Sequence, residues 1–164
     1  MDANDIIRSR GEMETILREE SLGYLALSVE GEPYIVPLNY AYIDGTIVLH
    51  CGFEGKKIDY LRANPRVCFA VGRQTGEVQE HAAETSCHVD NDSVICYGTA
   101  RTVDNLGERA RTLNAFNRTF RAEADGISPA RVKNCNVVEI KIAEMTGRRE
   151  RDRTSTRWCW EFEG

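Results

Sequence analysis

The sequence has no long apolar run, no CxxC pair and only three histidines. No stretch approaches the ~20 consecutive apolar residues that a membrane-spanning helix needs. Residues 1–20 are acidic and polar, unlike a secretory signal. We therefore expect a cytoplasmic protein with no membrane partner.

An excess of positive charge is also lacking. The chain carries 21 Lys and Arg against 26 Asp and Glu, a net charge of −5, whereas binding a nucleic-acid backbone needs a basic footprint. We expect no nucleic-acid partner. The one basic run, residues 148–153, is predicted to be solvated tail. The alternative is a basic arm that reaches an anionic ligand or a partner subunit.

The cysteines are scattered and lack the spacing of a zinc site. In a cytosolic chain such cysteines are usually reduced, and the buried ones act as small hydrophobic residues. Cys87 and His88, with His81 nearby, could suggest a metal, but neighbouring residues on a strand point to opposite faces. We expect no metal. The six cysteines are Cys51, Cys68, Cys87, Cys96, Cys135 and Cys159.

The length of 164 residues fits one domain. We predict a single domain over residues 1–164, with 146–164 as a C-terminal tail. Strong turn signals, Glu30-Gly31-Glu32 and Asp44-Gly45, separate three apolar segments and predict an antiparallel meander. Its strands are expected at residues 22–29, 34–43 and 46–51.

Helical spacing and further strands fill the rest of the chain. The helices are predicted at 11–20, 55–64 and 106–120, the second ending where Asn64 precedes Pro65. Residues 73–85 are polar and predicted as a loop. The later strands are expected at 67–71, 93–103 and 137–142. Without a βαβ series, this order predicts a mainly β fold, an antiparallel barrel of about six strands with flanking helices.

Pro37 lies in the middle of an otherwise good strand, Tyr34 to Ile43. Proline gives no ladder N–H, so it belongs at an edge or a break. A break would turn the peptide groups of Leu38 and Asn39 toward a ligand, and a flat heteroaromatic ring suits such a site. An edge strand with no ligand is the equal alternative.

The segment His50 to Lys57 joins a strand end to a helix start through two glycines. Free N–H groups and the positive helix end favour an anion there. Lys56 and Lys57 oppose the helix dipole unless an anion offsets them, although two solvated lysines are the simpler reading. A hairpin would place residues 37–39 beside the strand leading to His50. The pair of sites therefore predicts a ligand with a flat ring and a phosphate.

The segments PYIVPLNY, LHCGFEGKKIDYLRANPRVCF and SVICYGTAR resemble the pyridoxamine 5′-phosphate oxidase-like flavoproteins. The chain is most similar to their nitroimidazole-resistance (Nim) branch, from about Met13 through Phe120. The resemblance implies a split β-barrel that forms a homodimer with flavin mononucleotide (FMN) at the interface.

The resemblance also implies the cofactor contacts. One strand would line the isoalloxazine ring, the neighbouring strand would lie close to it, and the helix start would hold the phosphate. Oxidases of the family carry Ser-Arg-Lys at the helix start, where this chain has Gly55-Lys56-Lys57. It therefore lacks the serine hydroxyl and the bidentate guanidinium of the arginine. The implied residues are Val36, Pro37, Leu38 and Asn39 for the first strand, His50 and Cys51 for the second, and Gly55, Lys56 and Lys57 for the phosphate.

The function implied is an FMN-dependent reductase of small oxidised compounds such as nitroaromatics, with His50 as a proton donor or ligand-positioning group. The alternative for His50 is a histidine that only packs and hydrogen-bonds. The alternatives are a non-catalytic flavin-binding or storage protein, a pyridoxamine phosphate oxidase-like oxidase, and binding of haem or a deazaflavin. The oxidase alternative is weaker because the C-terminal substrate arginines of the oxidases have no clear counterpart. Trp158 or Trp160 would either cover the partner's flavin or pack within the tail.

Overall fold

The computed structural model describes residues 6–81, 86–124 and 126–151. Within them lie eight strands and four helices, more than the sequence predicted. Residues 6–7 and 129–133 form elements too short to show a periodic pattern, and the strand predicted over 34–43 divides into two. The elements are β1 (Ile6–Ile7), α1 (Arg10–Glu19), β2 (Leu22–Val29), β3 (Glu32–Asn39), β4 (Ala41–Ile43), β5 (Thr46–Cys51), α2 (Lys56–Ala63), β6 (Arg66–His81), β7 (Ser86–Thr102), α3 (Leu106–Phe120), α4 (Pro129–Lys133) and β8 (Asn136–Glu150).

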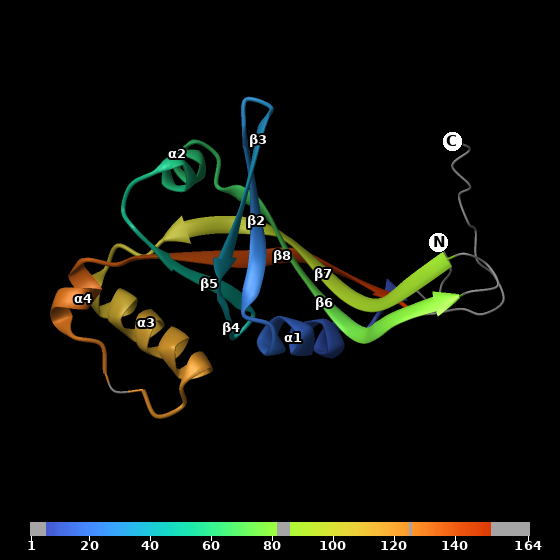
Figure 1. Ribbon diagram of the computed structural model, residues 1–164. Helices are drawn as coiled ribbons and strands as arrows, with labels where there is room; N and C mark the ends of the chain where they lie inside the picture. The colour runs from blue at the N-terminus through green and yellow to red at the C-terminus, as the bar shows by residue number, and fades with distance from the viewer. Residues whose placement is uncertain (1–5, 82–85, 125, 152–164) are drawn as a thin grey trace.

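The strands form one antiparallel sheet in the order β3-β2-β6-β7-β8-β5-β4, with β1 paired to β8. The two edge strands, β3 and β4, follow each other in the chain and are separated only by Tyr40. Because this connection is so short, the two edges of the sheet must lie close together. The sheet therefore curls back on itself (Figure 1). The predicted split barrel is confirmed.

The main core lies inside the curled sheet and beneath α1. Phe69 and Tyr40 are almost completely buried, and their rings meet edge to face with centroids 4.8 Å apart. The Tyr40 hydroxyl donates to the Leu17 carbonyl at 2.9 Å, which joins α1 to the barrel. The helix buries Met13, Ile16 and Leu17, the spacing expected of an amphipathic helix.

A smaller core lies on the other face of β5, where α3 and α4 pack. Along β5, Val48 belongs to this second core, whereas Ile47 and Leu49 point into the main core. The helices contribute Leu113, Phe116 and Val132. As Figure 1 shows, α3 and α4 sit at one end of the sheet, opposite the arm made by β6 and β7.

Three strands extend farther than predicted, and one of them, β7, begins at Ser86 and not at Ser93. Residues 73–81 continue β6 instead of forming a loop, and residues 146–150 belong to β8 instead of a tail. Both predictions were wrong because apolar alternation marks a strand only where it covers a core. Beyond the core the polar ladder continues, with Arg73 opposite Asp92 and Arg149 opposite the same residue.

The basic run near the C-terminus is not a solvated tail over its described part. Arg149 and Arg151 donate to the buried carboxylate of Asp92 at 3.1 and 2.8 Å. Arg73 lies 3.5 Å from the same group and also pairs with Glu19. The run thus fastens β8 to β7 and β6.

The strand predicted over residues 34–43 divides at Tyr40 and not at Pro37. Pro37 stays in β3, opposite Tyr24 of β2. As an edge strand, β3 tolerates a residue that lacks the N–H, so Pro37 marks a sheet edge and not a break in the strand. The Tyr40 amide leaves the ladder and donates to the Ser21 carbonyl at 3.3 Å.

None of the helices in the described ranges is both long and apolar enough to cross a membrane. Those ranges also hold no group of three or more His, Cys, Asp or Glu that could bind a metal. The side chains of His81, Cys87 and His88 lie outside what the structure describes, as do Arg153, Trp158 and Trp160.

Candidate functional site

The start of α2 is open toward an anion. Gly55 caps the helix with a φ of 111°, a conformation that side chains rarely adopt, and no side chain caps the helix. Its carbonyl accepts from Ile58 and Asp59, while the preceding N–H groups have no partner within the helix. A Cβ at Gly55 would meet no atom within 4 Å. The space and the donors fit a phosphate.

The two lysines of this turn have different surroundings. The amine of Lys56 lies over the rings of Tyr34 and Tyr60, 4.9 and 5.3 Å from their centroids. Those rings are themselves 5.4 Å apart. This double cation–π contact holds Lys56 against β3. Lys57 instead lies near the end of β5, where its positive charge helps lower the pKa of His50.

His50 lies at the end of β5, opposite Val137 of β8. Its ring meets Phe116 of α3 edge to face, with centroids 4.8 Å apart. The pKa of His50 is lowered from 6.5, first by partial loss of water around the ring and then by the charges of Arg131 and Lys57. The imidazole is therefore mainly neutral near pH 7.

Cys51 points to the other side of β5 and packs against the main core. Burial raises its pKa, and nearby Cys135 adds to this, while Lys57 works in the opposite direction. The thiol therefore stays protonated near pH 7 and is a poor nucleophile. Its contribution to a ligand site is packing.

The predicted ring-binding residues alternate along β3. Val36 and Leu38 pack against the main core, whereas Pro37 and Asn39 are exposed. The Asn39 amide donates to the Ser21 carbonyl at 3.0 Å. In the described sheet β3 pairs with β2, and the hairpin with β5 involves only β4. The expected pairing of 37–39 beside the strand to His50 was wrong, because the chain changes sheet edge at Tyr40.

The segment 34–57 is nevertheless brought together by a different route. Tyr34 of β3 contacts Lys56 and Tyr60 of α2, so the edge strand reaches the helix start. Sequence reasoning missed Phe116 and Arg131, which lie beside His50. Phe116 follows the apolar spacing of α3, which shows burial and not a role at a site, and no sequence signal points to Arg131.

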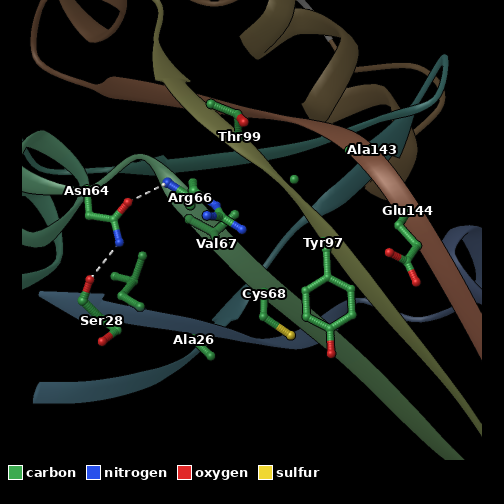
Figure 2. Close-up of a pocket in the computed structure, with 12 residues that line it drawn as sticks. Ala26, Ser28, Asn64, Arg66, Val67, Cys68, Tyr97, Thr99, Ala143 and Glu144 are labelled. Atoms are coloured by element: carbon green, nitrogen blue, oxygen red, sulfur yellow. Dashed lines mark hydrogen bonds between the residues drawn. The ribbon is translucent and has the colours of Figure 1, made fainter. Parts of the chain in front are cut away.

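A separate hollow of about 540 Å³ lies on the outer face of β2, β6 and β7. Figure 2 shows Arg66, Cys68 and Tyr97 around it. Asn64 borders it and joins two strands, since its amide donates to the Ser28 carbonyl at 2.9 Å and its oxygen accepts from the Arg66 amide at 3.1 Å.

The curled antiparallel sheet and the glycine-opened helix start define a protein of the split-barrel class. The family described as pyridoxamine 5′-phosphate oxidase matches residues 9–149. The chain belongs to this family.

Solved structures agree with this assignment. A candidate 5-nitroimidazole antibiotic resistance protein from Bacteroides thetaiotaomicron is 26% identical with a TM-score of 0.78, and the match covers 88% of this chain and 86% of that one. A FAD-binding protein from Mesorhizobium loti is also 26% identical, with a TM-score of 0.65 and coverage of 87% and 96%. The FAD and heme binding protein from Mycobacterium smegmatis, 16% identical with a TM-score of 0.76 and coverage of 88% and 72%, shares the fold.

A sequence relative comes from Rhizobium meliloti (strain 1021) and is an uncharacterised protein. It is 36% identical over 94 residues, which cover 50% of this chain and 61% of the relative. The matched part thus spans less than two thirds of that protein.

Proposed function

We propose that the protein binds FMN, with the phosphate at the start of α2, and reduces small oxidised compounds such as nitroaromatics. The observation that carries the proposal is the start of α2 at Gly55, where no side chain caps the helix, the space is open and Lys57 follows in the first turn. Family membership and the similarity to FAD-binding proteins support a flavin. The similarity to the candidate nitroimidazole resistance protein supports the substrate class.

When bound, the flavin supplies the electron transfer, and the chain supplies binding, orientation and protons. Val36 to Asn39 would run along the ring, while Lys57 and the free N–H groups of α2 hold the phosphate. His50 is the proton donor at the site. Loss of water around the ring, and then the charges of Arg131 and Lys57, lower the pKa of His50, and a bound phosphate near Lys57 would raise it toward protonation.

The exposed outer face of the sheet supports a homodimer with the flavin at its interface. Large apolar side chains lie on this face, where Ala70 of β6 pairs with both Tyr24 and Ile95, and monomeric soluble proteins rarely expose large apolar patches. The side chains are Leu22, Tyr24, Ile95 and Tyr97, between 36% and 48% exposed. Light scattering should report a dimer, and the double variant Ile95→Asp, Tyr97→Asp should be a folded monomer. A wild-type monomer would contradict the proposal.

The decisive experiment is purification, an absorbance spectrum and mass spectrometry of the released ligand. A flavin spectrum with released FMN is expected; released FAD would keep the flavin site but correct the cofactor. A colourless protein that takes up neither flavin would overturn the proposal.

Turnover is tested separately with the flavin-loaded protein, NADH or NADPH, and a nitroimidazole. Reduction of the nitro group is expected, and His50→Ala should slow it. If chemically reduced flavin passes its electrons to no acceptor faster than to oxygen, the protein stores or carries flavin and is not a reductase. Oxidation of pyridoxamine phosphate would support the oxidase alternative.

A further inference from the structure

Arg109 occupies an unusual place for an arginine, within the buried stripe of α3. It is 6% exposed and shares the stripe with Leu113 and Phe116. Its Nε donates to the Val103 carbonyl at 2.8 Å, and an Nη lies 3.5 Å from the Asp104 carbonyl. These bonds hold the guanidinium plane at the start of α3. Burying a charge is unfavourable unless it has such partners.

This guanidinium lies over the ring of Phe53. The Arg109 Cζ lies 5.2 Å from the centroid of the Phe53 ring, a cation–π contact. The Phe53 carbonyl accepts from the Arg62 side chain of α2 at 3.3 Å. Phe53 is therefore held on its ring by α3 and on its backbone by α2, although the residue as a whole remains 39% exposed.

Phe53 lies in the loop whose geometry decides where the start of α2 points. Gly52 and Gly55 leave the backbone around it with wide freedom, and Gly55 takes a φ of 111°. In such a loop, a side chain that is held in place limits the conformations that the backbone can adopt. Phe53 is the large apolar side chain between β5 and α2.

We propose that Arg109 is a positioning residue for the phosphate site: its stack on Phe53 holds the loop 52–55 so that the first N–H groups of α2 point at the ligand. This rests on the proposed function for the identity of the ligand as a flavin phosphate. The same helix places Phe116 against His50. α3 therefore contacts the segment from His50 to Gly55 at two residues, His50 and Phe53.

The test compares FMN with riboflavin, which has the same ring and no phosphate. Arg109→Met keeps the length of the side chain and removes its charge, and Phe53→Leu removes the aromatic partner. For both variants the Kd for FMN should rise about tenfold, the effect of losing one cation–π contact at a partly desolvated site, while the Kd for riboflavin stays within about twofold. Phe53→Tyr keeps an aromatic ring at this position and should bind FMN with the wild-type Kd. Arg118→Met, in the last turn of the same helix, is the control.

Hydrogen exchange gives a readout that needs no flavin. In the ligand-free protein, Arg109→Met and Phe53→Leu should speed exchange of the amides in residues 53–57 and leave those of β7 unchanged. If wild-type protein bound no flavin, the proposed function would fail, and exchange alone would still test the positioning.

The positioning role is overturned if both variants keep wild-type FMN affinity and wild-type exchange. Equal losses for FMN and riboflavin would also overturn it, since they would mean a general loss of structure. If Arg109→Met does not fold, Phe53→Leu, which leaves the bonds to Val103 and Asp104 intact, decides the question.

Discussion

The ring of His50 meets the ring of Phe116 edge to face, with centroids 4.8 Å apart. His50 comes from the end of β5 and Phe116 from the buried stripe of α3. The contact takes water away from one side of the imidazole, and Arg131 and Lys57 add positive charge nearby. All three effects favour the neutral ring.

We expect nuclear magnetic resonance to show a pKa for His50 below 6.5 in the ligand-free protein. Arg131→Met should raise that pKa because it removes a positive charge. Binding of FMN should raise it too, since the phosphate offsets Lys57. An unchanged pKa in the Arg131 variant would show that the charge of Arg131 does not act on His50.

The two lysines at the start of α2 should have unequal effects on flavin binding. Lys57→Gln should weaken FMN binding about tenfold and leave riboflavin binding unchanged, because it removes one charge–phosphate contact. Lys56→Gln should change the ratio of the Kd for FMN to the Kd for riboflavin much less, since Tyr34 and Tyr60 already hold the Lys56 amine. Fluorescence titration with both flavins measures the ratio. A larger effect at Lys56 would reverse the assignment.

Asp92 should be the most sensitive charged residue in the fold. Its side chain is 2% exposed and faces Arg73 from β6 and Arg149 and Arg151 from the end of β8. Asp92→Asn should lower the free energy of unfolding by about 2 kcal/mol near pH 7, because it removes charge-assisted hydrogen bonds that three partly exposed arginines share. Urea unfolding measures this. Asp59→Asn, in an exposed pair with Arg62 at 3.8 Å, should change stability by less than about 0.5 kcal/mol.

The contribution of Asp92 to the free energy of unfolding should depend on pH. Burial acts to raise its pKa, but hydrogen bonds from Arg149 and Arg151 outweigh it, so the folded-state pKa lies below 3.8. A depressed carboxylate pKa contributes stability above the unfolded pKa and loses it as pH falls through the folded value. The difference between wild type and Asp92→Asn should therefore shrink below pH 3.8. A constant difference would contradict the charge argument.

Gly98 should not tolerate a side chain. A Cβ there would lie 2.4 Å from the Lys141 backbone oxygen, at the irregular step between β7 and β8. Backbone cannot move aside without breaking ladder bonds, so Gly98→Ala should cost about 3 kcal/mol of unfolding free energy. Gly72→Ala is the matched control in β6, because a Cβ there meets nothing within 4 Å. Equal unfolding temperatures for Gly98→Ala and Gly72→Ala would contradict this prediction.

Much of the fold could be predicted because local patterns decide it. The helix over 106–120 and the strands over 22–29 and 46–51 have the bounds expected, since each shows an apolar periodicity and a clear turn or cap. The polar ends of β6 and β8 could not be predicted. Their stability comes from cross-strand partners such as Asp92, which are distant in sequence.

The sequence by itself determined the family and the glycine-lysine helix start, because both are properties of one contiguous segment. Only the tertiary structure decided what surrounds that segment. It separates Lys56, held by Tyr34 and Tyr60, from Lys57 beside His50, and it stacks Arg109 on Phe53. These contacts join residues from different elements, and their distances depend on how the sheet curls and how α3 packs against it.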